Sequence, residues 1–123
     1  MRVEVALGDV VDRVTILRIK ALRLRDEARI ANVRAELAAL EQAWGAEALP
    51  AMETLPQWAR LVVVNEGLWD VEDALREHEG RGDFGRAFVE LARSVYQLND
   101  ERAALKRQIN LELGSRLIEE KSW

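Results

Sequence analysis

The stretch FVELARSVYQLNDERAALKRQINLEL, residues 88–113, decides the fold of this chain. It contains no glycine or proline, and its apolar residues recur every three or four positions, as on one face of an α-helix. These residues are Phe88, Leu91, Val95, Leu98, Leu105, Ile109 and Leu113. We predict one long amphipathic helix from about residue 84 to 113, with Asp83 as its N-cap, and a last short helical piece at 116–121.

The same period recurs in three earlier segments, so three more helices are expected. Polar capping residues mark where these helices begin, and glycine and proline mark where they end. The expected helices are about 9–24 with Asp9 as N-cap, 27–45 with Asp26 as N-cap, and about 55–79 with Thr54 as N-cap and Pro56 in the first turn. One continuous helix through residue 25 is an alternative for the first two.

These segments predict an all-α fold, with about three-quarters of the residues helical, in a single domain over residues 1–123. Two antiparallel helical hairpins, joined by the proline-containing linker 45–56, would form either a four-helix bundle or an elongated coiled-coil-like assembly. The alternating residues 2–7 could add a short extended arm at the N-terminus.

Composition excludes several classes of function. The chain has no cysteine and one histidine, which removes disulfides, thiol chemistry, cysteine-based zinc sites and histidine-rich metal centres. Its net charge of -4 is mild and its charges are interspersed, unlike the clustered basic face of a nucleic-acid-binding protein. No apolar run has the length of a signal peptide or a membrane span. We therefore expect a soluble cytoplasmic protein with no metal, cofactor, nucleic-acid or membrane partner.

Several charged and amide side chains fall on the apolar faces of the predicted helices. Arg102 occupies a core position of the 88–113 stretch, and other polar residues lie beside it or on the apolar arcs of the first and third helices. The set comprises Arg102, Lys106, Asn99, Asn65, Glu72, Lys20 and Arg13. A charge on such a face must be paired internally, bind a ligand, or extend to the rim of the core.

The antiparallel arrangement of the last two helices limits which of these residues can meet. Residues equidistant from the turn near Gly82 face each other, so Asn65 should lie at the level of Asn99 and Arg102. Glu72 should face residues 92–95 or reach toward the first helix. Arg102 then has to find an acid on the first helix, in another subunit, or in a ligand.

Three strings in the sequence are distinctive together: VDRVTILRIK at 11–20, LWDVED at 68–73 and ND-x-R-A-x-L-K-x-x-I-N at 99–110. With IANVRAEL at 30–37, they resemble a bacterial family of short all-helical proteins of unknown function. The resemblance implies an all-α fold and brings no activity, substrate or catalytic residue with it. The chain departs from the family pattern at Trp123, where a tyrosine usually follows Glu-Lys-Ser.

Two functions follow from these patterns. The first is a non-catalytic helical module that self-associates or binds a protein partner, as a homodimer, because the two hairpins have more apolar surface than they can cover in each other. The alternative is a helical bundle that binds a small anionic ligand with the inward cations. That bundle would be similar in architecture, though not in spacing, to the helical chorismate mutases, which are isomerases.

Overall fold

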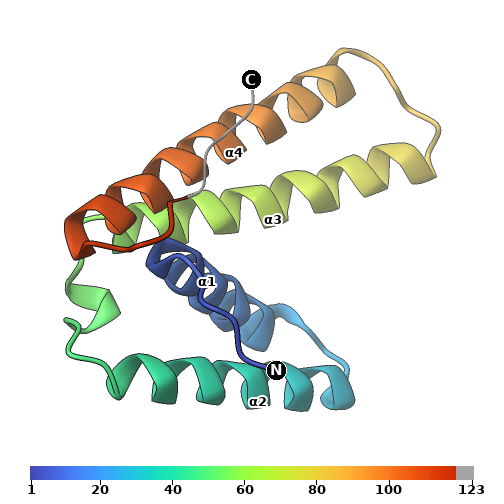
Figure 1. Cartoon of the computed structure of the whole chain (residues 1–123). Coiled ribbons are helices and arrows are strands. Elements are labelled where there is room, and N and C mark those ends of the chain that lie inside the picture. The colour runs from blue at the N-terminus through green and yellow to red at the C-terminus, as the bar shows by residue number, and fades with distance from the viewer. Residues whose placement is uncertain (119–123) are drawn as a thin grey trace.

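The computed structural model describes residues 1–118 and contains four α-helices and one turn of 3-10 helix (Figure 1). The elements are α1 (Leu7–Arg23), α2 (Glu27–Gly45), η1 (Met52–Thr54), α3 (Trp58–Gly80) and α4 (Arg86–Leu113). The all-α prediction is confirmed: the chain is 76% helical, and no strand occurs in the described residues. Residues 1–6 therefore lead into α1 without forming a strand.

The predicted start of the first helix is wrong. α1 begins at Leu7, with Ala6 at its N-cap position, and Asp9 lies inside the first turn. The caps come instead from α4 and the segment directly after it: the Asn110 Oδ1 atom accepts a hydrogen bond from the Gly8 amide at 2.6 Å, and the Ser115 Oγ atom accepts one from the Leu7 amide at 3.1 Å. These side chains take the place of a local cap, because they satisfy amides that have no partner within the helix.

The other helix ends agree with the sequence prediction in part. Asp26 caps α2 as predicted, and its Oδ1 atom accepts hydrogen bonds from the Ala28 and Arg29 amides at 2.9 and 3.2 Å. Thr54 lies in η1 and does not cap α3, which begins two residues after Pro56 with Gln57 at its N-cap position.

At the last helix, the Asp83 Oδ1 atom accepts a hydrogen bond from the Gly85 amide, but α4 begins only at Arg86 with Gly85 as its N-cap residue. The predicted helical piece at 116–121 is wrong for residues 116–118, which are not helical, and its remainder lies outside the described residues. Gly114 ends α4 in the left-handed conformation, at φ 66°, which glycine adopts without strain.

α1 is the central helix of the fold. It packs against α2 on one side and against both α3 and α4 on the other, whereas α2 has no extensive contact with the α3–α4 pair. α3 and α4 run antiparallel as a long hairpin that extends beyond α1 (Figure 1). The helices thus form three layers: α2, then α1, then the hairpin.

The hydrophobic core lies where α1 covers the base of the hairpin, the end that contains Trp58 and Leu113. Its buried members are Val11, Val14, Trp44, Met52, Leu55, Leu61, Val64, Leu68, Leu105 and Ile109. Arg18 of α1 links three elements around this core. Its guanidinium binds Glu41 of α2 and Glu53 of η1, and it lies 4.9 Å from the centre of the Trp58 ring of α3. Arg18 therefore holds α1 against α2, η1 and the start of α3.

Candidate functional site

A buried polar network joins α1, α3 and α4 beside the core. Its centre is Asp12, which is 3% exposed. Arg102 binds this carboxylate with two parallel hydrogen bonds, from Nε to Oδ1 at 2.9 Å and from Nη2 to Oδ2 at 2.5 Å. Asn65 donates from Nδ2 to the same Oδ1 atom at 3.0 Å and to the Thr15 hydroxyl at 2.7 Å. Bidentate, charge-assisted bonds of this kind are among the strongest polar contacts in proteins, so the network holds the three helices in one register.

Arg102 therefore finds its acid on the first helix, one of the three sources that the sequence allowed. The same pairing repeats at the next level of α1 and α4, where the Lys106 Nζ atom lies 2.8 Å from the Asp9 Oδ1 atom. Residue numbers rise along α1 as they fall along α4 in these two pairs, so the helices run antiparallel. Asp9 and Asp12 are the only acids of α1, and both face α4.

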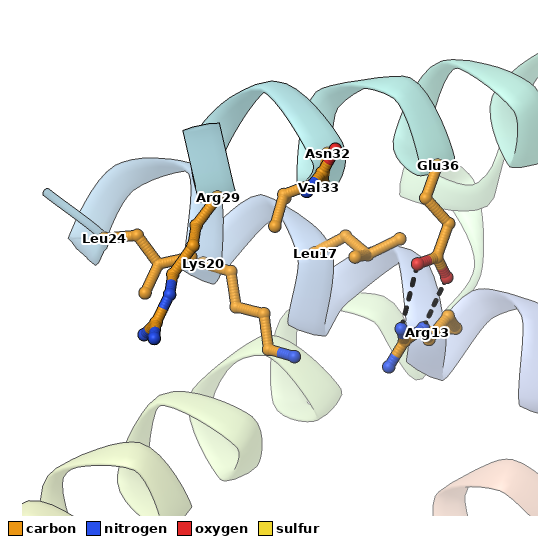
Figure 2. A pocket seen from close by; sticks show the side chains of 8 residues that line it. All are labelled: Arg13, Leu17, Lys20, Leu24, Arg29, Asn32, Val33 and Glu36. Carbon is orange, nitrogen blue, oxygen red and sulfur yellow. Dashed lines mark hydrogen bonds and ion pairs between the residues drawn. The ribbon is translucent and has the colours of Figure 1, made fainter. Parts of the chain in front are cut away.

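Arg13 lies on the opposite side of α1. Its guanidinium binds Glu36 of α2 through two hydrogen bonds of 2.7 and 3.0 Å, at a shallow cavity between α1 and α2 (Figure 2). These bonds hold the pKa of the Glu36 carboxyl below its usual value, and the Lys20 charge adds to the effect. Lys20 lines this cavity as well, and Arg13 and Lys106 are the two predicted site residues that do not line the second cavity, between α1, α3 and α4.

The remaining five predicted residues line one cavity of about 360 Å³ between α1, α3 and α4, named here the interhelical groove. They are Lys20, Asn65, Glu72, Asn99 and Arg102. Apolar side chains complete part of the wall, from Ile16 of α1 and from Leu68 and Trp69 of α3, and Asp73 and Arg76 follow along α3. The groove therefore presents charges of both signs and two amides next to an apolar surface.

Two groups in the groove are not used by the fold. Among residues 1–118, neither the Lys20 ammonium nor the Glu72 carboxylate forms a hydrogen bond or an ion pair. Lys20 is half-buried, and its side chain extends from α1 toward α3 (Figure 2). By contrast, the Arg76 guanidinium has the neighbouring Asp73 carboxylate at 3.6 Å. Lys20 and Glu72 are therefore free to meet groups from outside the chain.

The described side chains contain no cluster of three or more potential metal ligands. The single histidine, His78, lies near the tip of the hairpin, where its Nδ1 atom is 3.3 Å from the Asp83 carboxylate. It is not among the residues that line the groove. The groove accordingly offers groups that bind and orient a molecule, and the histidine lies apart from them.

Sequence reasoning missed three residues that build this region: Gly8, Asp12 and Thr15. Asp12 could have been found, because α1 carries two acids three residues apart and α4 carries Arg102 and Lys106 four residues apart. Gly8 leaves no such signal. A Cβ atom there would lie 2.4 Å from the Lys106 backbone oxygen, so the close contact of α1 with α4 requires glycine.

Comparison with known proteins identifies the family. All of residues 1–123 match the model of a family of unknown function (DUF6165), and the chain belongs to this family. No curated protein and no solved structure matches the chain significantly. In addition, none of the described helices combines the length and the apolar character needed to cross a membrane. The family brings no activity with it, so a function has to be argued from the geometry.

Proposed function

We propose that the protein is a non-catalytic helical module that self-associates through the outer hairpin, defined as residues 71–98. The observation that carries the proposal is the change in burial along α3 and α4. At the base, Leu61, Val64 and Ile109 are completely buried. In the outer hairpin no residue is buried, and the apolar residues that face the other helix, such as Leu75 and Leu91, are only half-buried. Two helices alone cannot close a core there.

One side of α4 in this region also carries large apolar residues that no neighbour covers. Val89 is 42% exposed and Tyr96 is 58% exposed. They are seven residues apart, so they lie on the same side of the helix. Burying a valine side chain fully stabilises an assembly by about 1.5–3 kcal/mol, and tyrosine is enriched at interfaces. This surface favours a partner with a matching apolar face.

A second copy of the chain is the partner with such a face. A two-fold axis brings the same surface of both copies together, and two antiparallel hairpins then form four helices around a common core. Covering the outer hairpin in this way would extend the core that α1 closes at the base.

The isomerase alternative has less support from the geometry. A site for a dianion needs cations whose charge is directed at the ligand. Here Arg102 is bound by Asp12 and Lys106 by Asp9, so both inward cations face carboxylates of α1. The interior is therefore balanced in charge, as expected for a structural network.

Sedimentation velocity of the full chain at high micromolar concentration tests the proposal. We expect a dimer for the wild type and a monomer for Val89→Glu and Tyr96→Glu, because a carboxylate would be buried in the interface. Leu22→Glu is the matched control, since Leu22 is an 87% exposed apolar residue of α1 and does not belong to the outer hairpin, so the variant should leave the dimer intact. Circular dichroism verifies that each variant is folded. A monomeric wild type, or dimeric glutamate variants, would contradict the proposal.

A further inference from the structure

The charges of the interhelical groove are balanced in number. The cations that line it are Lys20, Arg76 and Arg102, and the carboxylates at the groove or bound to these cations are Asp12, Glu72 and Asp73. Asp12 neutralises Arg102 and Asp73 neighbours Arg76. One cation, Lys20, and one carboxylate, Glu72, have no hydrogen bond or ion pair among the described residues, and they come from different helices; the Lys20 charge acts only at longer range on Glu36.

From this arrangement we propose that the groove binds a small zwitterion with an apolar body, of the α-amino acid class. The ligand carboxylate binds the Lys20 ammonium, and the ligand ammonium binds the Glu72 carboxylate. No ion pair joins Lys20 to Glu72, so the Lys20 Nζ atom lies more than 4 Å from the Glu72 carboxylate oxygens, and both residues line the same cavity of about 360 Å³. The site is independent of self-association, because Val89 and Tyr96 do not line the groove.

The ligand has to carry both charges because each single charge meets a repulsive group. A simple anion that approaches Lys20 also approaches the Glu72 carboxylate, and a simple cation that approaches Glu72 also approaches Lys20. A like charge on the wall of the same cavity disfavours the binding of a singly charged ligand. A molecule with both charges satisfies both residues and leaves no charge uncompensated.

The apolar surface and the volume of the groove define the rest of the ligand. Leu68 is 8% exposed, and the Trp69 ring is held in place by the Arg23 guanidinium, 5.8 Å from the ring centre, which in turn binds Asp70. This surface fits an aliphatic or aromatic side chain. The cavity of about 360 Å³ is at the lower end of the range for ligand pockets, which indicates a single small molecule.

The groove is also formed in advance of binding. Asn65 is 5% exposed and is fixed by Asp12 and Thr15, and the Arg102 side chain is fixed by Asp12. These contacts hold α1, α3 and α4 at set distances, so the helix positions that carry Lys20 and Glu72 are fixed before a ligand arrives. Less conformational freedom is then lost when the ligand binds.

Isothermal titration of the full chain with L-phenylalanine and L-leucine tests the proposal. The comparison compounds lack one charge each: 3-phenylpropanoate and 4-methylpentanoate lack the ammonium, and 2-phenylethylamine and 3-methylbutylamine lack the carboxylate. We expect at least one amino acid to bind with a millimolar or lower Kd, and each of its singly charged analogues to bind about tenfold more weakly or worse, since one charge-assisted hydrogen bond is lost.

The variants Lys20→Met and Glu72→Gln should each weaken amino-acid binding about tenfold without a loss of stability, because neither residue supports the fold. Arg34→Met and Glu79→Gln are matched controls, as exposed residues outside the groove that should bind like the wild type. The proposal is overturned if neither amino acid binds at low millimolar concentration. It is also overturned if an analogue without the ammonium binds as tightly as its amino acid, or if the Lys20 variant retains full affinity.

Discussion

Removing the Arg102 guanidinium should destabilise the fold more than removing the Asp12 carboxylate that it binds. In Arg102→Met, the Asp12 side chain, 5% exposed, keeps among the described residues only its hydrogen bond from Asn65 and remains a buried charge without an ion-pair partner. In Asp12→Ala, the Arg102 side chain, 29% exposed, can turn toward water. Loss of Arg102 should therefore lower the free energy of unfolding more than loss of Asp12.

The magnitudes follow from this difference in burial. Leaving one member of a buried pair without its partner costs about 3–5 kcal/mol, which is the range expected for Arg102→Met. Losing hydrogen bonds while the remaining group reaches solvent costs about 1–3 kcal/mol, which is the range for Asp12→Ala. The double variant leaves no unpaired charge, so its loss should be about 3 kcal/mol or less, with a coupling energy near 2–3 kcal/mol.

Urea denaturation followed by circular dichroism at pH 7 measures all four proteins of this cycle. Because a domain of this size has a free energy of unfolding of about 5–15 kcal/mol, Arg102→Met could be partly unfolded in water. Arg102→Lys then serves as a milder variant that keeps the charge and loses the bidentate geometry. Additivity of the two single variants to within about 0.5 kcal/mol would refute the reasoning. So would a loss below about 1 kcal/mol in Arg102→Met.

Two further predictions concern α1. Gly8→Ala should lower the free energy of unfolding by about 1–3 kcal/mol, because the new Cβ atom would lie 2.4 Å from a backbone oxygen of α4. Gly80 has open space around it, so Gly80→Ala should be neutral or slightly stabilising in the same urea assay. Equal effects of the two substitutions would contradict this account. Hydrogen bonds from arginines of α1 lower the pKa of the Glu36 and Glu53 carboxyls below the ordinary 4.5. The two ion pairs therefore contribute fully to stability above pH 4.5, and this contribution is lost as the pH falls through the pKa of each carboxyl in the folded protein. Scanning calorimetry should show that the melting temperature decreases as the pH is lowered below about 4.5, and that it decreases less steeply in the double variant Glu36→Gln/Glu53→Gln. The effect is modest because both carboxyls are exposed. If the dependence of the melting temperature on pH is the same in the variant, these ion pairs are not its source.

The sequence predicted the helices well because the apolar period of each helix is a local property. The same period identified Arg102 as a charge on a core face, and the residue indeed lies between helices. The start of α1 was not predictable in this way. Its caps, Asn110 and Ser115, are more than 100 positions away in the chain, and a local rule assigns the cap to Asp9 instead.

The partners of the polar residues depended on which helices are neighbours. A helical period indicates the face on which a residue lies, but not which element covers that face. Arg13 and Lys20 were grouped because they are seven residues apart, yet α1 lies between two layers. Arg13 binds Glu36 of α2, whereas Lys20 lines both the cavity toward α2 and the groove. Antiparallel geometry placed Asn65 near Arg102, since a short turn fixes the register of α3 and α4. No such turn joins α1 to α4, and Asp12 was therefore missed.

The dependence of α1 on α4 also sets an order on how the chain matures during its synthesis. The Gly8 amide and the Asn110 side chain that caps it are 102 positions apart. At about 5–20 residues per second, roughly 5–20 s of translation separate them. Until α4 has been made, Val11 and Val14 lack the part of their core that Leu105 and Ile109 supply. Of the four helices described, α1 is thus made before the other three and is the last to reach its final environment.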